Sequence, residues 1–137
     1  MAILNPYISF KDTARDAMEF YKSVLGGELF FSTFGDMGGS DAPNAEGIMH
    51  SSLQTPAGFT IFASDTPDGM EYKPGNNISI SISGTEADEL KGYWAGLSNG
   101  ATVTVPFGKQ PWGDEFGMLI DKFGIAWMVN LSDPARG

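Results

Sequence analysis

Residues Pro111 to Leu131 read PWGDEFGMLIDKFGIAWMVNL, and this stretch decides the fold of the chain. Its two apolar runs, Phe116 to Ile120 and Ile125 to Leu131, are joined by the turn Asp121-Lys122-Phe123-Gly124. Glycine at the last turn position adopts a positive φ at no steric cost, and aspartate opens a turn with a side-chain acceptor, so the pattern predicts a β-hairpin. An earlier segment, Ile48 to Asp65, has the same plan. The chain therefore contains one structural unit twice.

Periodicity predicts the remaining elements. Alternating apolar and polar residues predict further strands at 3–10, 28–34, 48–54, 59–64, 77–83 and 101–107. Helical spacing of apolar residues predicts one helix that is capped by Asp12 or Thr13 and ends at Gly26-Gly27. A second helix is expected to be capped by Thr85. Each copy thus runs strand, helix and three strands.

The duplication predicts an α+β fold in a single domain. One βαβββ module has a small core alone, so we expect the two modules to form a curled mixed sheet around a cleft, with the helices outside. Module 1 is expected at residues 1–66, a linker at 67–76 and module 2 at 77–133. Asn5 aligns with Asn77, an offset of 72 residues (77 − 5). The cleft is the expected ligand site.

Composition excludes several classes of function. The 137 residues include 8 Lys+Arg and 17 Asp+Glu, a net charge of -9, and such a surface repels nucleic acid. The chain has no cysteine, which excludes disulfides and thiolate chemistry and suits a reducing compartment. No stretch approaches the roughly 20 continuous apolar residues of a membrane span, and the first residues lack a basic export signal. We therefore expect a cytoplasmic protein with neither a nucleic-acid nor a membrane partner.

Two motifs carry a family resemblance. AMEFYKSVLGGEL at 17–29 and DKFGIAWMVN at 121–130, with the duplicated βαβββ pattern, resemble the vicinal-oxygen-chelate superfamily of glyoxalases, dioxygenases and bleomycin- or fosfomycin-resistance proteins. Within it, NPYISF, IMH and WGDEFG resemble the PhnB-like branch. The resemblance implies a small-molecule ligand and a homodimer. Some relatives carry the name of a ubiquinone-pathway methyltransferase, yet no strand here leads into a glycine-rich cofactor loop, so we expect no methyl transfer.

The resemblance also implies where a metal would bind. Metal-dependent members of the superfamily take ligands from the first and fourth strands of each half, which correspond here to Asn5, Phe62, Asn77 and Met128. Phenylalanine cannot ligate, methionine is a soft ligand that suits copper(I), and an amide oxygen is a weak ligand for a divalent ion. We therefore expect neither a metal site nor a cofactor.

Strand phase predicts which side chains line the cleft. The phase that faces the helices takes large apolar residues, and the opposite phase mixes aromatic, amide and hydroxyl groups. From that opposite phase, the candidate ligand-binding residues are Asn5, Tyr7, Phe62, Asn77, Ser79, Met128 and Asn130. Such a lining fits a small, mostly uncharged organic ligand. The alternative for Phe62 and Met128 is that they only fill the interior.

Three more residues are candidates by type. His50 is the one histidine of the chain, and an imidazole can act as a general base or hydrogen-bond donor near neutral pH, although a structural role is the alternative. Trp112 could close over a ligand, and Asp114 could accept a proton or bind a cationic group. Alternatively, both residues shape the turn after Pro111.

Two hypotheses follow from these residues. The first is a binding protein that holds a small molecule without transforming it. The second is an enzyme that acts on a small oxygen-rich substrate. It would be a lyase or isomerase that uses His50 with Tyr7 or Asp114, or a glyoxalase-like enzyme whose metal ligands lie elsewhere.

Overall fold

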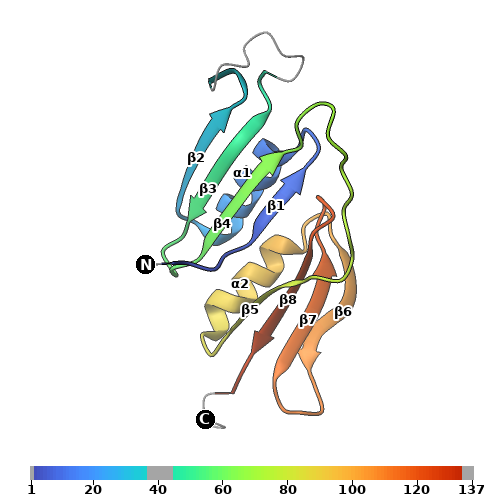
Figure 1. The fold of residues 1–137 in the computed structure, drawn as a ribbon. Coiled ribbons are helices and arrows are strands. Elements are labelled where there is room, and N and C mark those ends of the chain that lie inside the picture. Colours follow the sequence, from blue (N-terminus) through green and yellow to red (C-terminus); the bar gives the residue numbers. More distant parts are fainter. Residues whose placement is uncertain (1, 37–44, 134–137) are drawn as a thin grey trace. The chain divides into compact units, whose positions relative to one another are not determined.

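The computed structural model describes residues 2–36 and 45–133 (Figure 1). In chain order, its elements are β1 (Tyr7–Phe10), α1 (Ala14–Leu25), β2 (Glu28–Thr33), β3 (Ile48–Gln54), β4 (Thr60–Asp65), β5 (Ile80–Gly84), α2 (Ala87–Leu97), β6 (Thr102–Lys109), β7 (Glu115–Ile120) and β8 (Ala126–Leu131). The α+β class and the repeated βαβββ order are confirmed. The chain divides into two compact units, unit 1 (Met1–Pro74) and unit 2 (Gly75–Gly137).

Each unit is a four-stranded mixed sheet with one helix on one face (Figure 1). In unit 1 the strand order is β1-β4-β3-β2, with β1 parallel to β4 and the other neighbours antiparallel. Unit 2 repeats this arrangement as β5-β8-β7-β6, with β5 parallel to β8. The hairpin predicted around Asp121 is the β7–β8 pair.

The core of each unit lies between its helix and its sheet. Among the strand residues predicted to face the helices, the buried ones are Phe10, Ile61, Ile82, Trp127 and Val129. Ile78, in the strand predicted at 77–83, lies before β5 and is 80% exposed. The neighbours in sequence of the buried residues on the same strands are more exposed, as the period of two requires. The predicted strand phase is therefore confirmed, which leaves one face of each sheet to the candidate site residues.

The hairpin turns show how the two units correspond. In unit 1 the N–H of Thr55 donates to the carbonyl of Phe59 at 3.0 Å, and in unit 2 Asp121 donates in the same way to Ile125 at 2.8 Å. These turns lie 66 residues apart (121 − 55). The third and fourth strands of the two units therefore correspond at an offset of 66.

The first strands correspond at a different offset. At an offset of 66 Phe62 matches Met128, and since Tyr7 pairs with Phe62 while Ser81 pairs with Met128, Tyr7 matches Ser81. The offset there is 74 (81 − 7), so the predicted alignment of Asn5 with Asn77 is wrong. The connection between the first strand and the helix is one residue shorter in unit 2 (two residues against three), a difference that strand alternation alone does not reveal.

The start of α1 is held by a residue distant in sequence. The N-cap residue Thr13 makes no side-chain capping bond. Instead, Oδ1 of Asp65 accepts the N–H of Ala14 at 2.9 Å, and Oδ2 accepts the N–H of Ile48 at 2.9 Å. Thr13 is the N-cap residue, one of the two positions predicted, but its side chain does not cap the helix. The buried carboxylate of Asp65, at the end of β4, supplies the acceptor and ties the helix to the start of β3.

We expect Asp65→Ala to lower the free energy of unfolding by about 3 kcal/mol, since two buried N–H groups lose a charged acceptor. The exposed Asp68 supplies the matched control, Asp68→Ala, which should change stability by less than about 0.5 kcal/mol. Urea denaturation followed by circular dichroism measures both effects. Equal midpoints for the two variants would show that Asp65 does not hold these elements.

Candidate functional site

Tyr7, His50 and Phe62 form a side-chain cluster in unit 1, which we call the aromatic–histidine cluster. Tyr7 on β1 and Phe62 on β4 are cross-strand partners, so their side chains lie on the same face of the sheet. Phe62 also pairs with Ser52 on β3, and His50 precedes Ser52 by two positions. All three side chains therefore lie on the face opposite α1.

The geometry of the cluster fixes the imidazole. The Tyr7 hydroxyl lies 3.1 Å from Nδ1 of His50. The His50 and Phe62 rings meet edge to face with centroids 5.0 Å apart, and the Tyr7 ring lies 6.0 Å from that of Phe62. Such aromatic pairs contribute about 1 kcal/mol each, enough to orient the rings. Because 52% of Tyr7 is exposed, the cluster is open to a ligand.

Hydrogen bonding leaves one nitrogen of His50 available. When the Tyr7 hydroxyl donates to Nδ1, the proton of the neutral imidazole is on Nε2. Within residues 2–36 and 45–133, Nε2 makes no hydrogen bond, so it can donate to a ligand oxygen. In the other tautomer Nδ1 donates to Tyr7, and Nε2 is a proton acceptor. In both forms the hydrogen bond between Tyr7 and Nδ1 orients the imidazole, and Nε2 can exchange a proton or a hydrogen bond with a ligand.

Asp114 and Asn130 form a second polar group, in unit 2. Oδ2 of the buried Asp114 accepts a hydrogen bond from Nδ2 of Asn130 at 3.0 Å. The same amide nitrogen donates to Oγ of Ser132 at 3.3 Å. Met128 lies two positions before Asn130 on β8 and shares its face of the sheet. This bonding leaves the amide oxygen of Asn130 able to accept a hydrogen bond from a ligand.

Trp112 lies in the turn between β6 and β7. Its indole packs edge to face on Phe116 with centroids 5.7 Å apart, and 51% of the residue is exposed. In the same turn the N–H of Gly113 donates to the carbonyl of Gln110 at 2.9 Å. The turn predicted for this segment is confirmed, and an exposed aromatic surface remains beside it.

Besides Trp112, three candidate residues lie outside both groups. The side chain of Asn5 donates to the carbonyl of Pro6 at 3.0 Å. Asn77 and Ser79 are exposed and precede β5, which begins at Ile80 and not at residue 77 as predicted. The strand position that pairs with Met128 is taken by Ser81, which strand alternation also indicates. Ser132 is the residue that sequence patterns did not single out, because it follows the end of a strand.

The donors in these groups do not fit a divalent metal ion. Phe62 and Met128 occupy two positions at which the family resemblance places ligands, and neither offers a hard oxygen or imidazole donor. Across the described residues, no group of three or more His, Cys, Asp or Glu side chains could hold a metal ion.

Among the helices of the described residues, none is both long and apolar enough to cross a membrane.

Comparison with known proteins gives relatives along nearly the whole chain. The family model of 3-demethylubiquinone-9 3-methyltransferase matches residues 3–130. Protein YjdN of Escherichia coli is 29% identical over 141 residues, which cover 93% of this chain and 94% of YjdN. These matches extend over both units.

Solved structures share the fold. Protein PA1353 from Pseudomonas aeruginosa is 32% identical, with a TM-score of 0.83 over 97% of this chain and 99% of PA1353. The PhnB protein from Bacillus cereus, described as a putative 3-demethylubiquinone-9 3-methyltransferase, has a TM-score of 0.74 at 19% identity, covering 96% of this chain and all of that one. Glyoxalase/bleomycin resistance/dioxygenase proteins have the same fold. This chain therefore belongs to the 3-demethylubiquinone-9 3-methyltransferase family and has the fold of the PhnB protein and of glyoxalase/bleomycin resistance/dioxygenase proteins.

Proposed function

We propose that this protein binds a small organic molecule at the aromatic–histidine cluster of unit 1. The observation that carries the proposal is the hydrogen bond of Tyr7 to His50, beside aromatic rings on a sheet face that the helix does not cover. A solvent-exposed tyrosine bonded to a lone histidine has little value for folding, whereas it orients a polar group for a ligand.

The chemistry of the cluster defines the class of ligand. Two aromatic rings provide apolar contact area for a flat molecule, and Nε2 of His50 provides one polar contact at a fixed position. The half-buried Ser52, cross-strand partner of Phe62, adds a hydroxyl on the same face. We infer a mostly uncharged molecule, aromatic or conjugated, that carries a carbonyl or hydroxyl oxygen.

The proposal leaves out the methyl transfer that the family name denotes. In unit 1 the connection from β1 into α1 is Lys11-Asp12-Thr13, and in unit 2 the connection from β5 into α2 is Thr85-Glu86. Neither connection is a glycine-rich loop of the kind that binds a nucleotide cofactor after a strand. The residues of the cluster favour binding, or proton transfer, at an oxygen-bearing molecule.

We expect small aromatic carbonyl and phenol compounds, screened by ¹H–¹⁵N NMR, to shift the amide signals of Tyr7, His50 and Phe62. Native mass spectrometry of the purified protein can identify a molecule that co-purifies. Phe62→Ala should weaken binding of the best compound at least about tenfold, because the site loses an aromatic wall. Tyr72→Ala is the control, because Tyr72 is an aromatic residue in the segment between β4 and β5, outside the cluster. Shifts confined to other amides, or equal affinity of both variants, would overturn this site.

The Tyr7–His50 hydrogen bond also favours a second function, proton transfer on the bound molecule as in a lyase or isomerase. In this function His50 takes a proton from the substrate through Nε2, and Tyr7 holds the imidazole in place. Asp114, the other predicted partner of His50, belongs to unit 2 and is bonded to Asn130.

Two conservative variants separate binding from turnover. For a compound identified as above, His50→Gln should retain binding within about threefold and abolish turnover if proton transfer operates. Tyr7→Phe should reduce turnover about tenfold, since only the orientation of the base is lost. If the compound is recovered unchanged after incubation with the wild-type protein, the enzyme function is excluded and only the binding function stands.

A further inference from the structure

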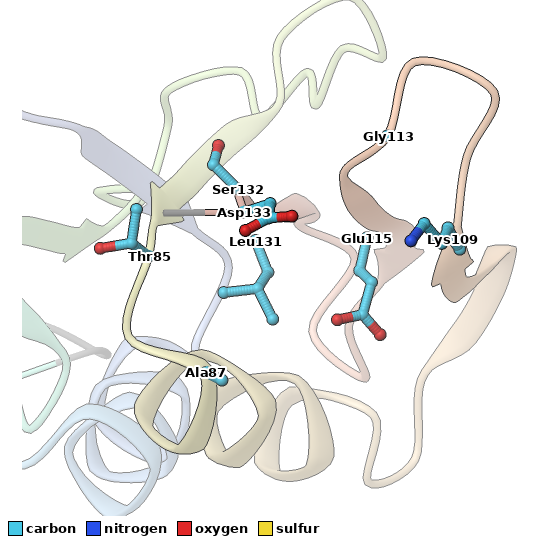
Figure 2. A pocket seen from close by; sticks show the side chains of 8 residues that line it. All are labelled: Thr85, Ala87, Lys109, Gly113, Glu115, Leu131, Ser132 and Asp133. Atoms are coloured by element: carbon cyan, nitrogen blue, oxygen red, sulfur yellow. The ribbon is translucent and has the colours of Figure 1, made fainter. Parts of the chain in front are cut away.

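Unit 2 has a cavity of about 430 Å³ beside the start of α2 (Figure 2). Its lining comes from the residues that enter α2, the facing ends of β6 and β7, and the end of β8, and it includes Thr85, Ala87, Lys109, Glu115, Leu131 and Asp133. All of these residues belong to unit 2, and none of them is a member of the aromatic–histidine cluster. Its volume suits a small metabolite.

Unit 1 places a carboxylate of its own at the corresponding position. Asp65 is the last residue of β4, and at an offset of 66 it matches Leu131, the last residue of β8. The carboxylate of Asp65 accepts the N–H of Ala14, which is the first residue of α1. The first residue of α2 is Ala87, which lines the cavity beside Leu131. Where unit 1 has a bound carboxylate, unit 2 has an apolar side chain and a cavity.

The first turn of α2 consequently lacks an acceptor. The N-cap residue Glu86 makes no side-chain capping bond, and its carboxylate accepts the N–H of Thr85 at 3.1 Å. Among the described residues, none accepts a hydrogen bond from the N–H of Ala87 or of Asp88. These N–H groups carry the partial positive charge of the helix, which favours a carboxylate.

The remaining walls carry charges of both signs. In the view of Figure 2, Lys109 and Glu115 lie on one side of the cavity and Thr85 on the other, with Leu131 between them. Lys109 and Glu115 are cross-strand partners, and in the described part of the chain the ammonium of Lys109 makes no ion pair within 4.0 Å. Glu115 lies 3.9 Å from the ammonium of Lys91, and Asp133 adds a second carboxylate to the lining.

We propose that this cavity binds a free α-amino acid. Its carboxylate lies beside Leu131, where it accepts the N–H of Ala87, as Asp65 accepts that of Ala14 in unit 1, and pairs with Lys109. Its ammonium group pairs with Glu115 and Asp133, and its side chain covers Leu131. An anion without an ammonium group would face two carboxylates, and a cation without a carboxylate would face Lys109 and the positive end of α2. A zwitterion satisfies both ends of the site.

The test is a ¹H–¹⁵N NMR titration of the full chain with each of the twenty standard amino acids. We expect at least one to shift the amide signals of Ala87, Gly113 and Glu115 saturably. For the strongest binder, the analogue that lacks the amino group and the analogue that lacks the carboxylate should each bind at least about tenfold more weakly. The proposal is overturned if no amino acid shifts these signals, or if either analogue binds as well as the parent.

Variants of the chain provide the second arm. Leu131→Asp places a carboxylate in unit 2 at the position that corresponds to Asp65 in unit 1. This variant should weaken the affinity for the amino acid at least about tenfold. Because this variant changes a buried residue, Lys109→Gln and Glu115→Gln give an independent measurement and should each weaken binding about tenfold. Lys73→Gln, in unit 1, is the matched control. Unchanged affinity of the Lys109 and Glu115 variants would exclude the proposed charge pairing.

Discussion

Replacing Gly27 with alanine is expected to lower the free energy of unfolding by at least about 4 kcal/mol, the largest effect we foresee for one methyl group. Gly27 has a φ of +103°, and a Cβ built on it would lie 2.1 Å from the carbonyl oxygen of Gln54. That oxygen belongs to the backbone of β3, where Gln54 pairs with Glu28 on one side and Thr60 on the other. The obstacle therefore cannot rotate away as a side chain would.

Gly58→Ala is the matched control for this effect. Gly58 has a φ of +91°, and a Cβ there would meet no atom within 4 Å. Its alanine variant should lose only the cost of a positive φ, about 1 to 2 kcal/mol. Urea denaturation followed by circular dichroism measures both variants. If the two lose equal stability, the close approach of Gly27 to Gln54 is not a determinant of the fold.

Gly27 also marks the limit of what the sequence predicts about the fold. The pair Gly26-Gly27 correctly predicts the end of a helix, because the signal is local: glycine favours the positive φ that follows a last helical turn. The contact with Gln54 comes from the pairing of β2 with β3, and Gln54 lies 27 residues further along the chain. No spacing in the sequence encodes that approach, so it emerges only from the tertiary structure.

The same limit applies to the candidate sites: local sequence patterns predict some of their features, and tertiary structure alone determines the others. Strand phase correctly predicts that Tyr7 and Phe62 lie on the open face of their sheet, because alternation is a local pattern. The hydrogen bond of Tyr7 to His50 joins residues 43 positions apart, and residue type alone does not predict it. The cavity of unit 2 was not predicted at all. The ends of several strands line it, and hydrophobic periodicity carries no signal there.

The two units share one fold but differ in the side chains at corresponding positions. At corresponding positions on the open faces, unit 1 has Tyr7 and Phe62 and unit 2 has Ser81 and Met128. At the ends of the corresponding fourth strands, Asp65 in unit 1 is replaced by Leu131 in unit 2. Because neither replacement disturbs the strand order, the two units are free to bind different molecules.

Replacing Asp121 with alanine is expected to cost about 4 kcal/mol, the second largest effect. Its buried carboxylate accepts the N–H groups of Phe123 at 2.8 Å and Ile125 at 3.0 Å through Oδ1. Oδ2 accepts the indole N–H of Trp127 at 2.8 Å. The first two bonds confirm the turn predicted for Asp121. The third joins the turn to the largest side chain of the buried core, and all three donors would be left without this acceptor.

Asp121→Asn isolates the bond to the indole. The amide keeps one oxygen for the two backbone N–H groups of the turn, and it presents an NH₂ donor to the N–H of Trp127, so we expect a loss of about 2 kcal/mol. In a Trp127→Phe background the indole donor is gone, and the cost of Asp121→Asn should fall to less than about 1 kcal/mol. A double-mutant cycle by urea denaturation measures this coupling. Additive losses would mean that Asp121 acts through the turn alone, and that the bond to Trp127 contributes nothing to the stability of unit 2.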